Sequence, residues 1–185
     1  MTGRSGRRSI RLPGWDYSSP ATYFLTICAY GRNLHLERTE FVAAITDAWK
    51  DIPVHFENAS VDAFVVMPNH VHGIVILSRG SQSVGARHAS PRRTHLAGTS
   101  PRGLGALVGS FKAAVTRDLR MRGLWGEEPF WQRNYYERII RESDELARAR
   151  DYVRKNPAAW HYDAENPARA QNETYELSWG WLESG

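Results

Sequence analysis

Two apolar stretches on either side of a Pro-Asn dipeptide constrain the fold of this chain more than any other feature. Residues 61–67 and 70–77 are rich in valine and isoleucine, and Pro68-Asn69 lies between them. β-branched side chains favour strands, whereas Pro and Asn favour turns. The pattern predicts an antiparallel hairpin whose second strand begins at His70.

The remaining periodic segments predict the other strands and helices. Aromatic and β-branched residues indicate strands over 23–30 and 130–140, and apolar residues at helical spacing indicate helices over 39–52, 104–121 and 145–155. We expect Thr39 and Ser143 to cap the first and last helices, and Pro53 and Asn156-Pro157 to end them. This order predicts an α+β, ferredoxin-like βαββαβ fold, with an antiparallel sheet, helices on one face, and a C-terminal helix and tail.

Changes in composition divide the 185 residues into segments. We expect a basic N-terminal arm at 1–20, one domain at 21–160 and a tail at 161–185. Residues 78–102 are full of Gly, Ser, Pro, Arg and His without periodicity, which indicates a flexible insertion within the domain.

The basic residues are mostly arginines. Lys and Arg number 24 against 20 Asp and Glu, and the only lysines are Lys50, Lys112 and Lys155. Arginine binds phosphate oxygens through two parallel hydrogen bonds, which makes nucleic acid a natural partner. A GC-rich coding sequence explains the same bias equally well.

Cysteine usage and hydropathy limit the class of protein further. Cys28 is the only cysteine, which excludes an intramolecular disulfide and a multi-cysteine metal site. The N-terminus lacks the apolar core of a signal peptide, and no apolar run approaches the ~20 residues of a membrane span. We therefore expect a cytoplasmic protein without membrane contact.

A pair of histidines opens the second strand of the predicted hairpin. His70 and His72 are two residues apart, so in a strand their rings lie on the same face and Val71 points the other way. Two adjacent imidazoles can bind a divalent metal ion. Histidines at this spacing are also often incidental, so the pair alone does not establish a metal site.

The last predicted helix carries two polar residues on one flank. Tyr152 and Asn156 are four residues apart and lie beside the apolar stripe of Leu146, Ala149 and Val153. This placement would present a phenol and an amide to the sheet. The alternative is a partly buried tyrosine and an asparagine that caps the helix before proline.

Three ordered sequence blocks resemble those of one enzyme family. Residues 67–73 (MPNHVHG), 131–141 (WQRNYYERIIR) and 151–157 (DYVRKNP) look like the signature blocks of REP-associated tyrosine transposases. These are bacterial single-tyrosine members of the HUH (His-hydrophobic-His) nuclease superfamily. The resemblance extends from about Tyr23 to Trp160, with the order and spacing of the blocks preserved.

The resemblance implies a site and a reaction. It implies that His70 and His72 bind a divalent cation, Mg²⁺ or Mn²⁺, and that Tyr152 is the nucleophile. Asn156 stands where relatives have a polar amide as third ligand. The implied reaction is cleavage and rejoining of single-stranded DNA through a 5′-phosphotyrosine, at palindromic repeats folded as hairpins. A tyrosine with an unperturbed pKa of ~10 must lose its proton to attack, which a nearby cation would favour.

Contacts with DNA are expected from basic residues in the arm and the sequence blocks. The predicted set is Arg7, Arg8, Arg11, Arg133, Arg154 and Lys155. The sequence leaves open whether the protein is a monomer or a homodimer, and whether Tyr152 serves its own histidines or those of a partner.

The sequence is also compatible with two other functions, and two other tyrosines are alternative nucleophiles. One alternative is a non-catalytic module that binds single-stranded nucleic acid on the same fold. The other is a phosphohydrolase that uses water, with Tyr152 in a structural role. Tyr135 and Tyr136 are rival nucleophiles, although both are expected to pack within the last strand. We expect surface or loop positions for the remaining histidines, His35, His55, His88, His95 and His161.

Overall fold

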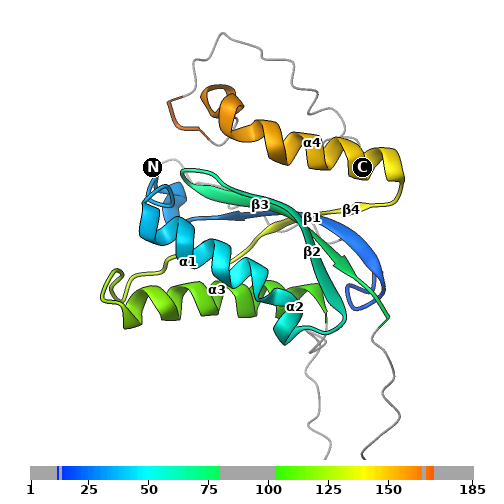
Figure 1. Cartoon of the computed structure of the whole chain (residues 1–185), viewed down its shortest axis with the longest axis horizontal. Coiled ribbons are helices and arrows are strands. Elements are labelled where there is room, and N and C mark those ends of the chain that lie inside the picture. The colour runs from blue at the N-terminus through cyan, green and yellow to red at the C-terminus, as the bar shows by residue number, and fades with distance from the viewer. Residues whose placement is uncertain (1–11, 13, 80–102, 164–165, 169–185) are drawn as a thin grey trace, which may run out of the picture.

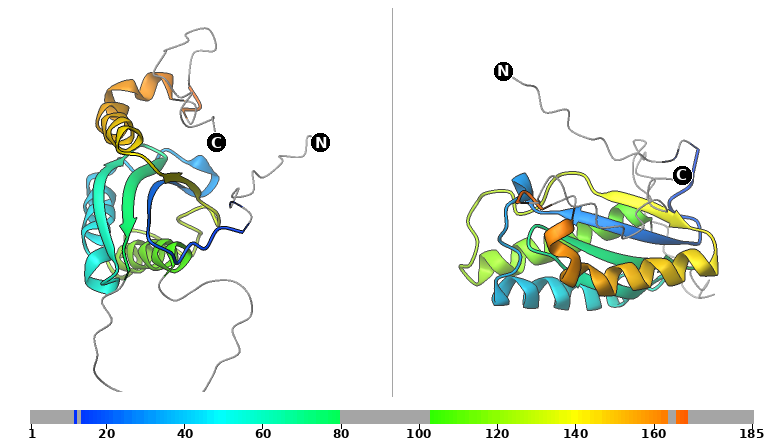
Figure 2. Two further views of the ribbon diagram at one scale, coloured as in Figure 1. Left: turned by 90° about the vertical axis from the view of Figure 1, so that its right-hand side faces the viewer. Right: turned by 90° about the horizontal axis from the view of Figure 1, so that it is seen from above.

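The protein folds around a four-stranded antiparallel sheet with helices on both faces. The computed structural model describes residues 12, 14–79, 103–163 and 166–168. The sheet has the order β2-β3-β1-β4 and consists of β1 (Ala21–Cys28), β2 (Ala59–Val66), β3 (His70–Leu77) and β4 (Tyr136–Ile140). Helices α1 (Thr39–Lys50) and α3 (Leu104–Met121) cover one face, and α4 (Ser143–Ala159) lies across the other (Figures 1 and 2). The predicted α+β, ferredoxin-like fold is confirmed, with α4 as the additional C-terminal helix.

The predicted hairpin forms one side of this sheet, with β2 at the edge and β3 in the interior. Strands β2 and β3 pair antiparallel, and the Met67 N–H donates to the His70 carbonyl across the Pro68-Asn69 turn at 2.8 Å. Strand β3 also pairs with β1, which places Cys28 opposite His70 and Thr26 opposite His72. A central strand with neighbours on both sides holds its side chains rigidly, so the histidine pair sits on the best-fixed part of the sheet.

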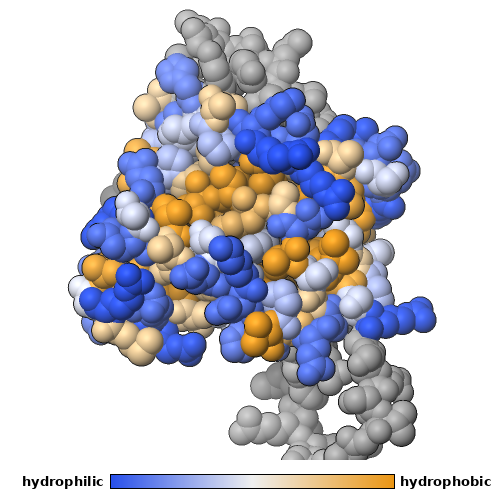
Figure 3. All heavy atoms as spheres, viewed as in Figure 1, coloured by the Kyte–Doolittle hydropathy of each residue, from blue (hydrophilic) through white to orange (hydrophobic). Residues whose placement is uncertain are grey.

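The two faces of the sheet build two separate cores. Alternate residues of β1 point to opposite faces, so Leu25 packs with α1 and α3 while Phe24 packs against α4. Strand β2 is the edge strand next to α4, and its residues are mostly half-buried. In the view of Figure 3, apolar side chains are exposed in the middle of the molecule, between α4 and α1.

A glycine in β3 allows α1 to pack closely on the sheet. A Cβ atom at Gly73 would lie only 2.4 Å from the Trp49 indole and 3.1 Å from the Phe64 ring. Those two rings stack with their centroids 4.5 Å apart. The last residue of the MPNHVHG block is therefore explained by packing on the face opposite the histidines.

The first helix differs from its prediction at both ends. Arg38 is its N-cap and no side chain caps it, so the predicted role of Thr39 is wrong. Pro53 does not simply end the helix, because it lies in the first turn of a second short helix, α2 (Ile52–His55). Proline is tolerated there because the first N–H groups of a helix have no intrahelical partner.

The last helix is longer than predicted. Ser143 is its first residue rather than its cap, and Pro157 lies inside it. Helical structure continues through Ala159 into a 3₁₀ turn, η2 (Trp160–Tyr162). The local preference of proline is overridden here because residues on both sides of it, Asn156 and Ala159, are buried against the body of the domain.

Strands β1 and β4 also differ from their predicted bounds. The first strand ends at Cys28 and is followed by a 3₁₀ turn, η1 (Tyr30–Arg32). The last strand begins only at Tyr136, because carbonyl groups of the preceding residues bind a lysine side chain instead of a neighbouring strand. The Lys112 ammonium group donates to the carbonyls of Gln132 and Asn134 at 2.8 and 3.0 Å. Carbonyls that point at a lysine do not extend the β ladder.

Several predicted segments lie outside the described residues. These are most of the arm at 1–20, residues 80–102 of the predicted insertion, and most of the tail at 161–185. Among the residues that the structure does describe, no helix combines the length and the apolar character that crossing a membrane requires.

Candidate functional site

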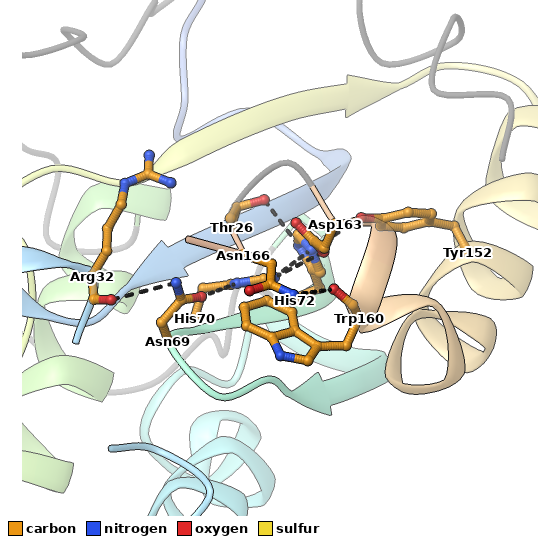
Figure 4. Close-up of polar contacts among 9 residues, drawn as sticks. All are labelled: Thr26, Arg32, Asn69, His70, His72, Tyr152, Trp160, Asp163 and Asn166. Atoms are coloured by element: carbon orange, nitrogen blue, oxygen red, sulfur yellow. Dashed lines mark hydrogen bonds and ion pairs between the residues drawn. The ribbon is translucent and has the colours of Figure 1, made fainter. Parts of the chain in front are cut away.

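The two histidines converge on one point beneath α4. His70 and His72 are 0% and 3% exposed, and their rings lie on the α4 face of β3. Their Nε2 atoms are 2.8 Å apart (Figure 4). The predicted same-face arrangement is therefore present, and both rings direct the same nitrogen toward the same place.

Each ring is oriented by a contact at its other nitrogen. His72 Nδ1 lies 3.0 Å from Thr26 Oγ1, and His70 Nδ1 lies 2.8 Å from Asn69 Oδ1. An N–H at each Nδ1 that donates to these oxygens leaves the Nε2 lone pairs free to face a cation. Metal-binding histidines are commonly held in this way by a hydrogen bond at the second nitrogen.

The environment keeps both imidazoles neutral. Burial lowers the pKa of His72 to about 3. Burial also holds the pKa of His70 well below its usual value, with smaller contributions from His72 and the Arg32 guanidinium. A neutral imidazole has the lone pair that a metal ion requires, so at pH 7 the pair is in its ligand form.

Tyr152 contacts the histidine pair from α4. Its hydroxyl lies 3.2 Å from His72 Nε2, and its ring packs edge-on against Phe24 with centroids 5.7 Å apart. Burial raises the pKa of the Tyr152 phenol, and the negative charge of Asp163 raises it further. The phenol is therefore protonated at pH 7 in the absence of a cation.

Asn156 lies one helical turn after Tyr152 and is buried. Its amide is close enough to the phenol to lower the pKa of Tyr152, against the larger effect of burial. Apart from this interaction with Tyr152, neither amide atom of Asn156 meets a hydrogen-bond partner among the described residues. A buried amide with unmet hydrogen-bonding capacity is costly, and a cation in the site would give its oxygen a partner. The donor set of two imidazoles and an amide thus fits a divalent cation.

A carboxylate that sequence reasoning missed joins the site. Asp163 is 1% exposed, and its Oδ2 lies 3.9 Å from His70 Nε2. One donor atom from each of His70, His72 and Asp163 lies within 4.8 Å of the others. The residue comes from the segment expected to be a tail, and its only signal in the sequence is an acidic residue shortly after the last helix.

The helix that carries Tyr152 is fixed to the sheet by charge as well as by apolar contacts. Arg150 binds Asp62 of β2 through two nitrogens, at 2.6 and 2.9 Å. Near the N-terminal end of α4, the Glu145 carboxylate accepts from the Arg138 side chain and the Arg141 N–H. The two contacts join α4 to β2 and to the end of β4, the two edge strands of the sheet.

The residues predicted to bind DNA are scattered in the structure. Arg133 is exposed in the segment before β4, and Arg154 and Lys155 are exposed on α4. Lys155 forms an ion pair with Asp151 at 2.7 Å. Arg7, Arg8 and Arg11 lie outside the described residues, and the role of the whole set stays a prediction.

The rival tyrosines occupy different faces. Tyr135 is buried in the core beneath α1 and α3. Tyr136 is half-buried and pairs with Thr26 across strands, which places it on the histidine face of the sheet. Tyr152 is the tyrosine with a hydrogen bond to the pair in the described part of the chain.

The other histidines differ in exposure. His55 and His161 are exposed as expected, whereas His88 and His95 lie outside the described residues. His35 lies in the loop before α1, as expected, and its ring is half-buried among Phe41, Trp125 and Phe130.

Known proteins resemble this chain in sequence and in fold. No protein-family model matches it. An uncharacterized protein of Haemophilus influenzae is 35% identical over 169 residues, which cover 85% of this chain and 91% of that relative. A second protein of the same organism, named "Putative REP-associated tyrosine transposase", is 25% identical over 151 residues, or 80% of this chain and 76% of the relative.

A solved structure shares the fold. It is the structure of a REP-associated tyrosine transposase bound to a REP hairpin, with a TM-score of 0.54, 17% sequence identity and 96% of each chain covered. The three sequence blocks resemble those of the same family. In sequence the chain is thus similar to a relative named as a REP-associated tyrosine transposase, and in fold it is similar to a solved transposase structure.

Proposed function

We propose that this protein is a metal-dependent, single-tyrosine HUH transposase that cleaves and rejoins single-stranded DNA through a covalent phosphotyrosine. The observation that carries the proposal is the contact of the Tyr152 hydroxyl with His72 Nε2, beside a second histidine nitrogen that points to the same place. A nucleophile and a candidate cation site thus share one buried position beneath α4.

The residues proposed to hold the cation are His70, His72 and Asn156. The neutral imidazoles and the buried amide of Asn156 one helical turn after Tyr152 support this assignment. A mixed nitrogen and oxygen site suits Mn²⁺, and Mg²⁺ binds where oxygen ligands and water complete it. When bound, a divalent cation supplies positive charge that polarises the scissile phosphate and favours loss of the phenol proton.

The proposed reaction exchanges one phosphodiester for another without consuming water. The Tyr152 oxygen attacks the phosphorus, and the bond from phosphorus to the 3′ oxygen breaks. The phenol loses its proton, and the departing 3′ oxygen gains one. Attack by a 3′-hydroxyl on the phosphotyrosine then restores Tyr152 and joins the strands, so the bond energy is conserved. A transposase needs this property and a hydrolase does not.

A folded DNA strand is the proposed substrate. Its support is the related transposase structure, which is bound to a REP hairpin. The net charge of +4 and the exposed Arg133 and Arg154 also favour an anionic partner. A reaction on the DNA of a bacterial cell would place the protein in the cytoplasm.

A denaturing gel tests the proposal. Labelled single-stranded hairpin DNA is incubated with the protein and Mn²⁺ or Mg²⁺, and a DNA-linked protein band is sought. We expect the band from the unchanged protein and from the control Tyr136→Phe, but not from Tyr152→Phe or after chelation. Binding of several hairpins without any adduct would favour a non-catalytic module, and metal-dependent cleavage that survives Tyr152→Phe would mean that water is the nucleophile.

A further inference from the structure

We propose that Asp163 is an anionic ligand of the cation held by His70 and His72. This inference rests on the proposed metal-dependent function and adds to it a residue from outside the three sequence blocks. It assigns a role to a buried carboxylate that the transposase reaction, as stated so far, does not use.

The positions of the donor atoms carry the proposal. Figure 4 shows the side chains of Asp163, His70, His72 and Tyr152 directed toward one another beneath α4. Asp163 Oδ2 lies 3.9 Å from His70 Nε2, and the two histidine nitrogens lie 2.8 Å apart. Atoms that share an ion at about 2.1–2.2 Å are roughly 3–4 Å from one another. The separations of 2.8 and 3.9 Å lie close to this range, and all three donor atoms lie within 4.8 Å of one another, which suits ligands of a common ion.

The chemistry of the three groups suits a divalent cation better than the histidines do alone. Two imidazoles contribute no charge, whereas a carboxylate contributes one negative charge and a hard oxygen, which Mg²⁺ and Mn²⁺ prefer. With Asn156, the two histidines and the carboxylate make four protein ligands, which leaves about two positions of an octahedral ion for DNA oxygens and water. The combination of two histidines and one carboxylate recurs in metalloenzymes that bind their substrate at the metal.

The main chain after α4 holds Asp163 in place. The Asp163 N–H donates to the Trp160 carbonyl at 3.1 Å, and the Asn166 N–H donates to the Asp163 carbonyl at 3.0 Å. The Asn166 side chain also donates to the Trp160 carbonyl at 3.0 Å. These bonds fold the chain back under the helix. They bring the carboxylate to the histidines at 1% exposure, where a fixed charge acts most strongly.

One segment would then supply both the nucleophile and the charged ligand. Tyr152 lies in α4 and Asp163 directly follows η2 in the same continuous segment, while the histidines belong to the sheet. Binding of the cation would join the sheet to this stretch. Cation affinity would accordingly report whether α4 is docked in the arrangement needed for attack.

Direct measurement of Mn²⁺ binding by calorimetry tests the inference in the full chain without DNA. We expect Asp163→Asn to weaken Mn²⁺ binding at least about tenfold. The matched control, Asp151→Asn, alters a carboxylate on α4 that pairs with Lys155 at the surface, and should leave the affinity unchanged. His70→Ala serves as the variant that removes a histidine ligand.

The outcomes separate this inference from the proposed function. Unchanged Mn²⁺ affinity in Asp163→Asn, together with its loss in His70→Ala, would overturn the role of Asp163 and leave the histidine site standing. Failure of the unchanged protein to bind Mn²⁺ would overturn both.

A second variant keeps the inference testable if Asp163→Asn does not fold. Asp163→Cys places a soft thiolate at the same position, so Cd²⁺ should produce a thiolate-to-metal absorption band beyond any seen in the unchanged protein. Absence of the additional band in the folded variant would overturn the proposal.

Discussion

At the scale of single residues, the site depends on which nitrogen of each histidine faces the cation. Thr26 and Asn69 engage the Nδ1 atoms, and the Nε2 atoms are left to converge. The chemistry of the pair is therefore set by neighbours that sequence spacing alone does not reveal, because Thr26 comes from a different strand.

The contact between Thr26 and His72 gives a first prediction. Thr26→Val removes the oxygen at His72 Nδ1 and keeps the branched shape that suits a strand. We expect Mn²⁺ affinity to fall by about tenfold with the fold retained, measured by calorimetry and circular dichroism. Thr22→Val, on the same strand and face, is the control. Equal affinity in the two variants would mean that the hydroxyl does not orient the ring.

His35 gives a prediction about pH. Burial lowers its pKa from 6.5, with a smaller effect of the Arg38 charge. The unfolded chain then binds more protons than the folded one as pH falls through 6.5, so stability contributed by neutral His35 is present above that pH and is lost below it.

The variant His35→Phe isolates this contribution. A phenyl ring fits the surrounding aromatic side chains and does not titrate, so the loss of stability between pH 7 and pH 5 should be smaller. It should not vanish, because the pKa values of His70 and His72 are lowered in the same direction. Urea unfolding at several pH values measures the difference, and identical pH profiles would show that His35 does not titrate on unfolding.

At the scale of elements, the hairpin and the long helices follow from the sequence, whereas their ends do not. The turn at Pro68-Asn69 and helix α3 match their predictions because local preferences and packing agree there. Helix α4 passes through Pro157 because burial of Asn156 and Ala159 outweighs the local preference for an end. The last strand is shortened by Lys112, a residue distant in sequence.

The contact between α1 and β3 gives a prediction at this scale. Gly73→Ala adds a methyl group that would meet the Trp49 indole at 2.4 Å, so we expect a loss of about 1–3 kcal/mol in the free energy of unfolding. Gly109→Ala is the control, since its Cβ meets nothing within 4 Å and alanine in a helix should stabilise by about 0.5–1 kcal/mol. Urea unfolding measures both, and equal effects would contradict the packing account.

At the scale of the whole molecule, the three blocks predicted the family, the histidine pair and the tyrosine that contacts it. They did not predict Asp163, because its place at the site depends on the turn after α4 rather than on any motif. Sequence periodicity locates elements along the chain, but the meeting of β3 with the segment after α4 is a tertiary event. The basic arm and the segment at 80–102 remain predictions.

The central claim is that Tyr152, and not another tyrosine, forms the bond to DNA. The most direct measurement is mass spectrometry of the adduct formed with hairpin DNA and Mn²⁺, after nuclease trimming and trypsin digestion. We expect a nucleotide on the peptide of residues 151–154, which contains Tyr152. A nucleotide on the peptide of residues 134–138, which contains Tyr135 and Tyr136, would contradict it.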